Sequence, residues 1–172
     1  MRVVSVNIGE PRVIQLNDKE ELTGYFKKPL DIPIVLGFEN VMNDFVSDRV
    51  HHGGVDKACY LYSSDHYEFW KMKYPDLDWD YGMFGENVTV AGLNESELFI
   101  GDVLEIGGAV VQVTQPRQPC YKMGVKFGES TIIKEFIEAP YPGIYVRVLQ
   151  EGSIQKGDEI RLVKKVQLIF QF

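Results

Sequence analysis

The chain has 172 residues, of which 45% are hydrophobic and 25% are charged, so it is long enough for one domain that buries its own core. Its 18 basic and 25 acidic side chains give a net charge of −7 at pH 7. This balance argues against non-specific binding to nucleic acid or to an anionic membrane, so an anionic ligand must be held by a local basic cluster.

The two cysteines, Cys59 and Cys120, stand far apart and belong to no Cys-x-x-Cys motif, which argues against a disulfide framework and a structural zinc site. No apolar run reaches the roughly 18 residues that a membrane span needs. Residues 1–6 alternate as a strand does and lack the features of a signal peptide. We therefore expect a soluble, cytoplasmic protein.

Short β-branched runs separated by turn residues dominate the chain. They predict strands over residues 3–8, 13–16, 32–36, 87–90, 102–106, 109–114, 143–149 and 159–163. Gly9-Glu10-Pro11 predicts a turn that returns residues 13–16 as the second arm of a hairpin with residues 3–8. The clearest hairpin joins 102–106 to 109–114, because Gly107-Gly108 suits a two-residue turn that needs positive φ.

Two helices are predicted. The first covers residues 65–73, with Ser63 or Ser64 as its cap and Pro75 beyond its end. The second covers residues 131–138, with Ser130 as its N-cap. Its apolar residues recur at helical spacing, which is typical of a helix that packs on a core.

Many short strands and few helices predict a mostly-β fold, a barrel or sandwich with helical inserts, built as one domain over residues 1–165. Residues 166–172 form an uncharged, β-prone tail. Such a segment is an aggregation hazard when exposed, so we expect it to pair with a sheet edge, pack in an interface or be disordered.

Several common catalytic motifs are absent, including G-x-S-x-G, the P-loop and the dinucleotide-binding glycine motif. Residues 76–80 carry alternating carboxylates as a calcium loop does. However, Tyr81 stands where that loop needs glycine and Asn87 where it needs glutamate, so a solvated acidic loop is favoured.

The three histidines, His51, His52 and His66, fall within one short stretch. Adjacent histidines on an extended segment point to opposite faces, so His51 and His52 are not expected to chelate one ion. Cys59 lies in an apolar run and is expected in the core.

Residues 49–58 contain a candidate anion site. Gly53-Gly54 can turn successive backbone N–H groups toward one anion, and Arg49 and Lys57 flank the pair. Arginine and lysine at these positions can neutralise a phosphate. A plain Gly-Gly turn with exposed charges explains the same pattern, and the spacing does not separate the two interpretations.

A second candidate site, residues 115–122, follows the clearest hairpin. Pro116 and Pro119 fix the path of the chain, and Cys120 lies between Arg117 and Lys122. Nearby cations favour the thiolate, which is the form that attacks electrophiles and binds soft metals. The alternative is that Cys120 is a small buried hydrophobic residue.

Seven sequence blocks, in order, carry a resemblance to a known family. They are residues 50–58, 65–67 with Trp70, 84–89, 100–102, 115–120 with Lys122, 143–149 and 157–158. With these blocks the chain resembles the MOSC domain proteins, named for the C-terminal domain of molybdenum cofactor sulfurases. The likeness is closest to the stand-alone bacterial YiiM-like subgroup.

The resemblance implies a MOSC-type β-barrel that binds the molybdenum cofactor (molybdopterin), a phosphorylated pterin dithiolene. It places the family's invariant cysteine, a molybdenum ligand in relatives that act as reductases, on Cys120. A thiolate suits a metal already held by dithiolene sulfurs. The implied reaction is the reduction of N-hydroxylated bases and related N-oxygenated compounds, with electrons from a separate donor reductase. The cofactor can be absent from the purified protein.

The resemblance also implies roles for single residues. Arg49, Gly53, Gly54 and Lys57 would bind the cofactor's phosphate or pterin edge, Asn87 would hydrogen-bond the pterin, Arg117 and Lys122 would balance anionic charge near the metal, and His52 or His66 would supply a proton. His66 is equally well explained as a packed helix residue.

Two functions therefore stay open, a molybdenum-dependent oxidoreductase and a non-enzymatic carrier that holds sulfur as a persulfide on Cys120 or delivers the cofactor. Longer members of the subgroup carry a three-helix module after the barrel, which we do not expect here because the sequence ends soon after Val163. The apolar tail is instead a candidate interface strand for a homo-oligomer.

Overall fold

The computed structural model describes residues 1–47 and 53–166, so the predicted site residues Arg49 and His52 and nearly all of the apolar tail lie outside the described residues. Its strands are β1 (Arg2–Gly9), β2 (Arg12–Leu16), β3 (Lys19–Thr23), β4 (Lys27–Leu30), β5 (Ile34–Leu36), β6 (Cys59–Ser63), β7 (Val88–Ala91), β8 (Val103–Ile106), β9 (Ala109–Pro116), β10 (Ile144–Gln150), β11 (Gly152–Ile154) and β12 (Ile160–Lys164). Its helices are α2 (Tyr67–Lys73), α3 (Tyr121–Phe127) and α4 (Thr131–Glu138), with 3-10 turns η1 (Val55–Lys57), η2 (Ser64–His66) and η3 (Glu95–Glu97).

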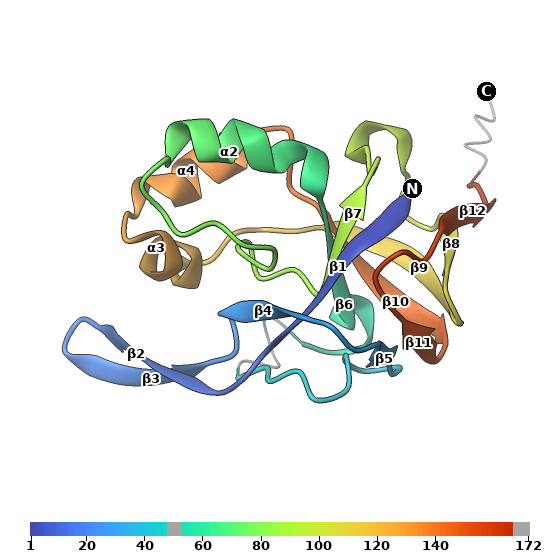
Figure 1. The fold of residues 1–172 in the computed structure, drawn as a ribbon, viewed down its shortest axis with the longest axis horizontal. Coiled ribbons are helices and arrows are strands. Elements are labelled where there is room, and N and C mark those ends of the chain that lie inside the picture. The colour runs from blue at the N-terminus through green and yellow to red at the C-terminus, as the bar shows by residue number, and fades with distance from the viewer. Residues whose placement is uncertain (48–52, 167–172) are drawn as a thin grey trace, which may run out of the picture.

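One curved sheet of eight strands forms the body of the molecule, in the order β12-β8-β9-β10-β6-β7-β1-β4 (Figure 1). The chain before β12 returns to β1, where the Val3 N–H donates to Asp158 O at 2.8 Å and the Ile160 N–H donates to Met1 O at 2.9 Å. The predicted mostly-β class is confirmed. The sheet is barrel-like, but a short bridge between β1 and the start of β12 replaces a full closing ladder.

The predicted hairpin between residues 3–8 and 13–16 is wrong. β2 pairs with β3, with Leu16 opposite Lys19, and the two strands project from the sheet (Figure 1). Asn17 and Asp18 have φ of 48° and 62°, the left-handed conformation that a primed two-residue turn requires. β1 pairs with β4 and β7 instead.

The two central strands β6 and β10 are buried on both faces, because side chains alternate between the faces of a sheet. Cys59 and Leu61 of β6 join an aliphatic core inside the curved sheet. Tyr60 and Tyr62 point to the other face and join an aromatic core with α2, α3 and α4. Tyr145 of β10 lies on the same aromatic face. The alternation therefore makes β6 the partition between two cores.

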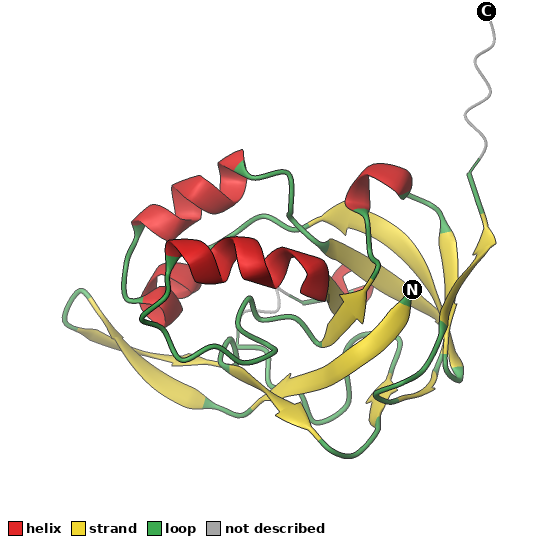
Figure 2. Ribbon diagram, turned by 45° about the horizontal axis from the view of Figure 1, so that its top comes forward, coloured by secondary structure: helices red, strands yellow, loops and turns green. Residues whose placement is uncertain are grey.

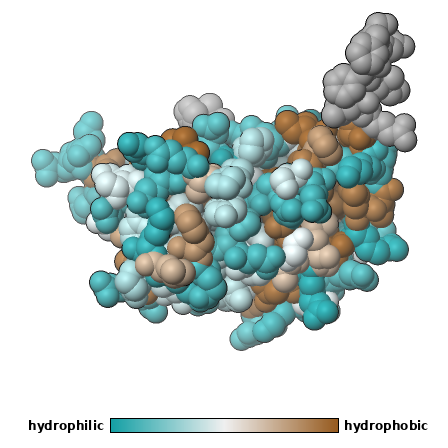
Figure 3. Space-filling model, turned by 90° about the horizontal axis from the view of Figure 1, so that it is seen from above, coloured by the Kyte–Doolittle hydropathy of each residue, from teal (hydrophilic) through white to brown (hydrophobic). Residues whose placement is uncertain are grey.

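The helices gather on one side of the sheet (Figures 1 and 2). The two predicted helices are confirmed: η2 and α2 cover residues 64–73, with the Ser63 hydroxyl accepting from the Asp65 N–H, and α4 has the predicted bounds. The sequence did not predict α3, whose seven residues contain Gly124. Figure 3, viewed from above, shows a mixed hydrophilic and hydrophobic surface over this layer.

The predicted hairpin of β8 and β9 is confirmed, with Ile106 opposite Ala109 and Gly107 at φ 52°. The closing strands β10 and β12 are also confirmed, with β11 and a turn between them. No helix among the described residues is long and apolar enough to span a membrane.

Candidate functional site

A cavity of about 230 Å³ opens between β6, β10, the start of α3 and the segments 23–27 and 39–47. It is lined by all the predicted site residues that the structure describes except His66, namely Gly53, Gly54, Lys57, Asn87, Arg117, Cys120 and Lys122. Its lining carries four basic side chains and two acidic ones, although the whole chain is acidic. The local basic cluster that an anionic ligand requires is therefore present.

Cys120 reaches the cavity from the N-cap position of α3. β9 ends at Pro116, and the extended backbone of Cys120 (φ −124°, ψ 170°) precedes the first turn of the helix. Cys120 is partly buried, and its thiol is free. Cys59 is buried in the aliphatic core, as expected, and burial raises the pKa of its thiol far above the usual range. Cys120 is thus the sulfur available to a ligand in the cavity.

Arg117 is a buried cation whose charge no carboxylate of the described residues neutralises. Arg117 is 5% exposed, and its Nη1 donates to the Phe84 carbonyl oxygen. The Nε atom has no hydrogen-bond partner. The guanidinium carbon lies 4.6 Å from the ring centre of Tyr60 and 5.4 Å from that of Tyr25. The faces of these two aromatic rings stabilise the cation.

Tyr25 is a cavity residue that the sequence analysis did not identify. It is 8% exposed, and its hydroxyl has no hydrogen-bond partner. Burial raises the pKa of this phenol far above its usual value, although the charge of Arg117 opposes the effect, so the hydroxyl stays a hydrogen-bond donor. A tyrosine between Gly24 and Phe26 carries no motif, so no sequence signal marked it.

The two lysines of the predicted site differ in their surroundings. Lys122 is buried, and its ammonium lies 3.0 Å from Ser47 Oγ and 3.4 Å from Glu21 Oε1. Lys57 belongs to η1, where its N–H donates to the Gly54 carbonyl at 3.0 Å. Gly54 has a φ of 93°, a conformation that suits glycine. The Gly-Gly segment thus forms a turn that faces the cavity with a lysine beside it.

Asn87 lines the cavity, but its side chain is already occupied. Its Oδ1 accepts from the Tyr60 N–H at 3.2 Å, and its Nδ2 donates to Asp44 Oδ2 at 2.9 Å. Asp44 also binds the Lys27 ammonium at 2.6 Å and accepts from the Gly9 N–H at 2.7 Å. In this structure the side chain holds the cavity wall together, and the expectation that Asn87 hydrogen-bonds a pterin stays a prediction.

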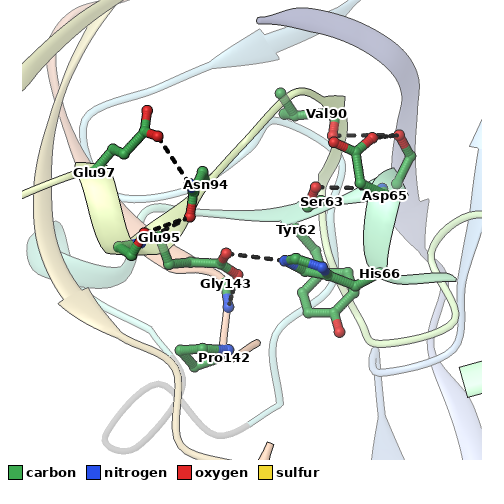
Figure 4. A network of polar contacts seen from close by, with 12 residues as sticks. Tyr62, Ser63, Asp65, His66, Val90, Asn94, Glu95, Glu97, Pro142 and Gly143 are labelled. Atoms are coloured by element: carbon green, nitrogen blue, oxygen red, sulfur yellow. Dashed lines mark hydrogen bonds and ion pairs between the residues drawn. The ribbon is translucent and has the colours of Figure 1, made fainter. Parts of the chain in front are cut away.

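His66 does not line the cavity. Its Nε2 lies 2.9 Å from Glu95 Oε2 (Figure 4). Its ring stacks on Tyr141 with the ring centres 4.1 Å apart. Glu95 Oε1 accepts from the Gly143 N–H at 2.9 Å. His66 is thus placed as a packed residue that links η2 to the start of β10, and not as a proton donor to a ligand near Cys120.

Glu86 fixes the loop that supports Arg117. It is fully buried, and it accepts from the Gly82 N–H at 3.0 Å, the Thr89 hydroxyl at 2.9 Å and the Phe84 N–H at 3.1 Å, as well as from the Tyr67 hydroxyl. Burial raises the pKa of this carboxyl, and the hydrogen bonds oppose the shift. The loop they hold presents the Phe84 carbonyl to Arg117.

Comparisons with known proteins give a consistent result. A model of the MOSC domain matches residues 48–161. The uncharacterized protein YflK of Bacillus subtilis is 40% identical over 163 residues, which cover 95% of this chain and 73% of that protein. A protein named "Reductase" from Gibberella moniliformis is 32% identical over 150 residues, 85% of this chain but only 26% of that protein.

Among solved structures, YiiM from Geobacillus stearothermophilus matches with a TM-score of 0.77 and 34% identity. The match covers 95% of this chain and 75% of that one. The chain thus spans about three quarters of YflK and YiiM and about a quarter of the reductase.

Proposed function

The chain belongs to the MOSC domain family, and we propose from this premise that it binds the molybdenum cofactor through Cys120 and reduces N-hydroxylated bases or related N-oxygenated compounds. One observation carries the proposal: the half-buried thiol shares a cavity with Arg117, Lys57 and Lys122 in an otherwise acidic chain. A thiolate among cations is the donor set that a soft metal on an anionic carrier needs.

The donor set fits this cofactor better than a bare metal ion. Among residues 1–47 and 53–166, no group of three or more His, Cys, Asp or Glu side chains is arranged to hold a metal. A metal bound at Cys120 must therefore bring most of its ligands with it, as a dithiolene does. The phosphorylated pterin is an anion, and the four basic side chains of the cavity lining outnumber its two acidic ones, which favours an anion electrostatically.

In this proposal the residues of the chain have separate roles in binding the cofactor. Cys120 provides the sulfur ligand, while Lys57 and Lys122 attract the phosphate or pterin edge. Arg117 supplies positive charge and one unpaired Nε–H donor in the wall of the cavity that Cys120 lines. The rings of Tyr60 and Tyr145 pack with their centres 5.2 Å apart and line the cavity, and such an apolar wall strengthens these interactions. When bound, the cofactor would supply the two-electron redox chemistry that the side chains lack.

Two parts of this reaction need groups from elsewhere. Electrons require a separate donor reductase, because the sequence carries no flavin, haem, iron–sulfur or nicotinamide motif. His66 is not placed to deliver a proton to this cavity, and His52 lies outside the described residues, so its proposed role stays a prediction. The protein named "Reductase" supports an oxidoreductase, although this chain matches only 26% of it.

A second candidate function follows from the partial exposure of Cys120. A donor protein can reach a half-buried thiol at the start of a helix, as a persulfide carrier requires. The cavity beside the thiol favours the cofactor-binding function, because a carrier has no need of it.

The deciding measurement is cofactor content. We would express the wild type, Cys120→Ser and Cys59→Ala in a host that makes the molybdenum cofactor, then measure molybdenum by mass spectrometry and pterin by fluorescence after oxidation. We expect near-stoichiometric molybdenum and pterin in the wild type and in Cys59→Ala, and loss of molybdenum in Cys120→Ser. Cys59→Ala is the matched control because it removes the other thiol, outside the cavity.

A wild type that carries neither molybdenum nor pterin would overturn this proposal. The carrier function would then be tested by intact mass, which should show one added sulfur atom on the wild type and none on Cys120→Ser.

A further inference from the structure

Two hydrogen-bond donors in the cavity wall lack an acceptor. They are the Nε–H of Arg117 and the hydroxyl of Tyr25, and both residues are more than nine-tenths buried. Both line the cavity that Cys120 lines. Nearly every buried polar group in a folded protein is paired, because an unpaired one loses its hydration without compensation. Two unpaired donors at one site therefore point to an acceptor that the protein chain does not supply.

The neighbouring groups show that this is a local property of the pair. Tyr60 lines the same cavity and also lies under the Arg117 guanidinium, yet its hydroxyl donates to the Pro142 carbonyl at 2.7 Å. Arg147 has an unpartnered Nε too, but it lies outside the cavity and forms an ion pair with Asp56 at the surface. Among the cavity-lining residues that the structure describes, buried side-chain donors without a partner occur only at Tyr25 and Arg117.

The two donor residues also lie next to each other. The Arg117 guanidinium carbon is 5.4 Å from the ring centre of Tyr25, and both residues line the cavity that Cys120 lines. An acceptor oxygen placed between them would receive one neutral and one charged donor. Hydrogen bonds from a charged donor are stronger than neutral ones, which favours an oxygen that carries partial or full negative charge.

We propose that the Tyr25 hydroxyl and the Arg117 Nε–H form a two-donor subsite for an acceptor oxygen on a molecule bound beside Cys120. The inference rests on the proposed function where it takes this oxygen to be the N-hydroxyl oxygen of the substrate. An oxygen of the bound cofactor has the same chemistry, and the experiment separates the two sources.

The assignment has a direct consequence for selectivity. Cleavage of the N–O bond, with two electrons from the donor reductase and two protons, turns R–NHOH into R–NH2 and water, so the product lacks the oxygen that the subsite holds. A site built to hydrogen-bond an oxygen discriminates against the analogue without it, because its buried donors are left unpaired. The subsite therefore favours substrate over product, and Tyr25 is a specificity-determining residue.

The test uses full-length protein purified from a host that makes the molybdenum cofactor. Binding of 6-hydroxylaminopurine and of adenine is measured by calorimetry for the wild type, Tyr25→Phe and the control Tyr81→Phe, whose ring is exposed. We expect the wild type and Tyr81→Phe to prefer the hydroxylated base. Tyr25→Phe should lose roughly 3- to 10-fold of this preference, the value of one hydrogen bond, with adenine binding unchanged.

The same samples are assayed for pterin and molybdenum, and their thermal unfolding is recorded. If Tyr25→Phe keeps the preference for the hydroxylated base but contains less pterin, the acceptor oxygen belongs to the cofactor. The two-donor subsite is then supported as a cofactor-binding subsite. If Tyr25→Phe changes neither purine preference nor pterin content, the proposal is overturned. It is also overturned if the variant's midpoint falls markedly in the free protein, since that would show a partner for the hydroxyl within the chain.

The design keeps this failure distinct from failure of the proposed function. A wild type without molybdenum or pterin that still prefers 6-hydroxylaminopurine would overturn cofactor binding and leave the subsite intact. If the wild type carries molybdenum and pterin but Tyr25→Phe behaves as Tyr81→Phe does, the subsite is overturned and cofactor binding stands.

Discussion

Glu86 offers the sharpest test of how the fold supports the site. Four donors converge on its buried carboxyl: the hydroxyls of Tyr67 and Thr89 and the N–H groups of Gly82 and Phe84. Three of them reach Oε1, and the Phe84 N–H reaches Oε2. Replacing Glu86 with Gln conserves size but puts an NH2 group where one oxygen stood.

The cost of Glu86→Gln follows from this count. The amide oxygen can keep the three donors at the Oε1 position, so the NH2 group must face the Phe84 N–H. Two buried donors are then left without acceptors, at about 1–3 kcal/mol each. We expect the free energy of unfolding to fall by about 2–6 kcal/mol, which for a chain of this length corresponds to a midpoint lowered by roughly 4–24 °C.

Urea unfolding followed by tryptophan fluorescence measures this change, with Glu97→Gln as the control. Glu97 accepts one hydrogen bond from Asn94 at the surface, so its substitution should stay within about 0.5 kcal/mol of the wild type. A Glu86→Gln variant as stable as Glu97→Gln would refute the reasoning, because the four hydrogen bonds would then contribute nothing measurable.

The difference in unfolding free energy between the wild type and Glu86→Gln should change with pH in a defined direction. Burial raises the pKa of Glu86, so the folded protein binds its proton more tightly than the unfolded chain does. The contribution of this group is fully present below the unfolded pKa and is lost as pH rises through the folded pKa. The stability difference between wild type and Glu86→Gln should therefore shrink from acidic toward neutral pH, and a difference that grew would contradict the assignment.

Three further variants test the cavity wall and the aromatic core by urea unfolding. Tyr60→Phe removes a hydroxyl that donates to Pro142 O and should cost about 1 kcal/mol; no loss would argue against that bond. Asp44→Asn leaves the buried Lys27 charge unpaired and should cost about 3–5 kcal/mol, and a loss below 1 kcal/mol would show that water reaches the pair. Phe136→Ala empties a fully buried site and should cost about 3–5 kcal/mol, while molybdenum content per folded molecule stays at the wild-type value.

The site shows where sequence reasoning succeeds and where it stops. Cys120, Arg117 and Lys122 were identified because prolines, cations and a thiol lie within one short segment. Tyr25 was not identified, because a tyrosine acquires meaning only from what surrounds it. His66 lies in a motif of the family, yet its ring is held by Glu95 and Tyr141 at a distance from the cavity lining.

The sequence by itself determined the features that depend on local periodicity and turn chemistry. The β-branched run in residues 109–114 produces β9, and the apolar stripe in residues 131–138 produces α4. Gly107-Gly108 sets the β8–β9 turn through positive φ. These signals act over a few residues, so they survive without knowledge of the rest of the fold.

Only the tertiary structure decided which of these pieces meet. It paired β1 with β7, used the amide of Asn87 to bind Asp44, and brought Tyr25 beside Arg117. Such contacts join residues that lie dozens of positions apart, and no local pattern encodes them, because each depends on the curvature of the whole sheet. The unpaired donors of the cavity are visible for the same reason only after every other polar group has found its partner.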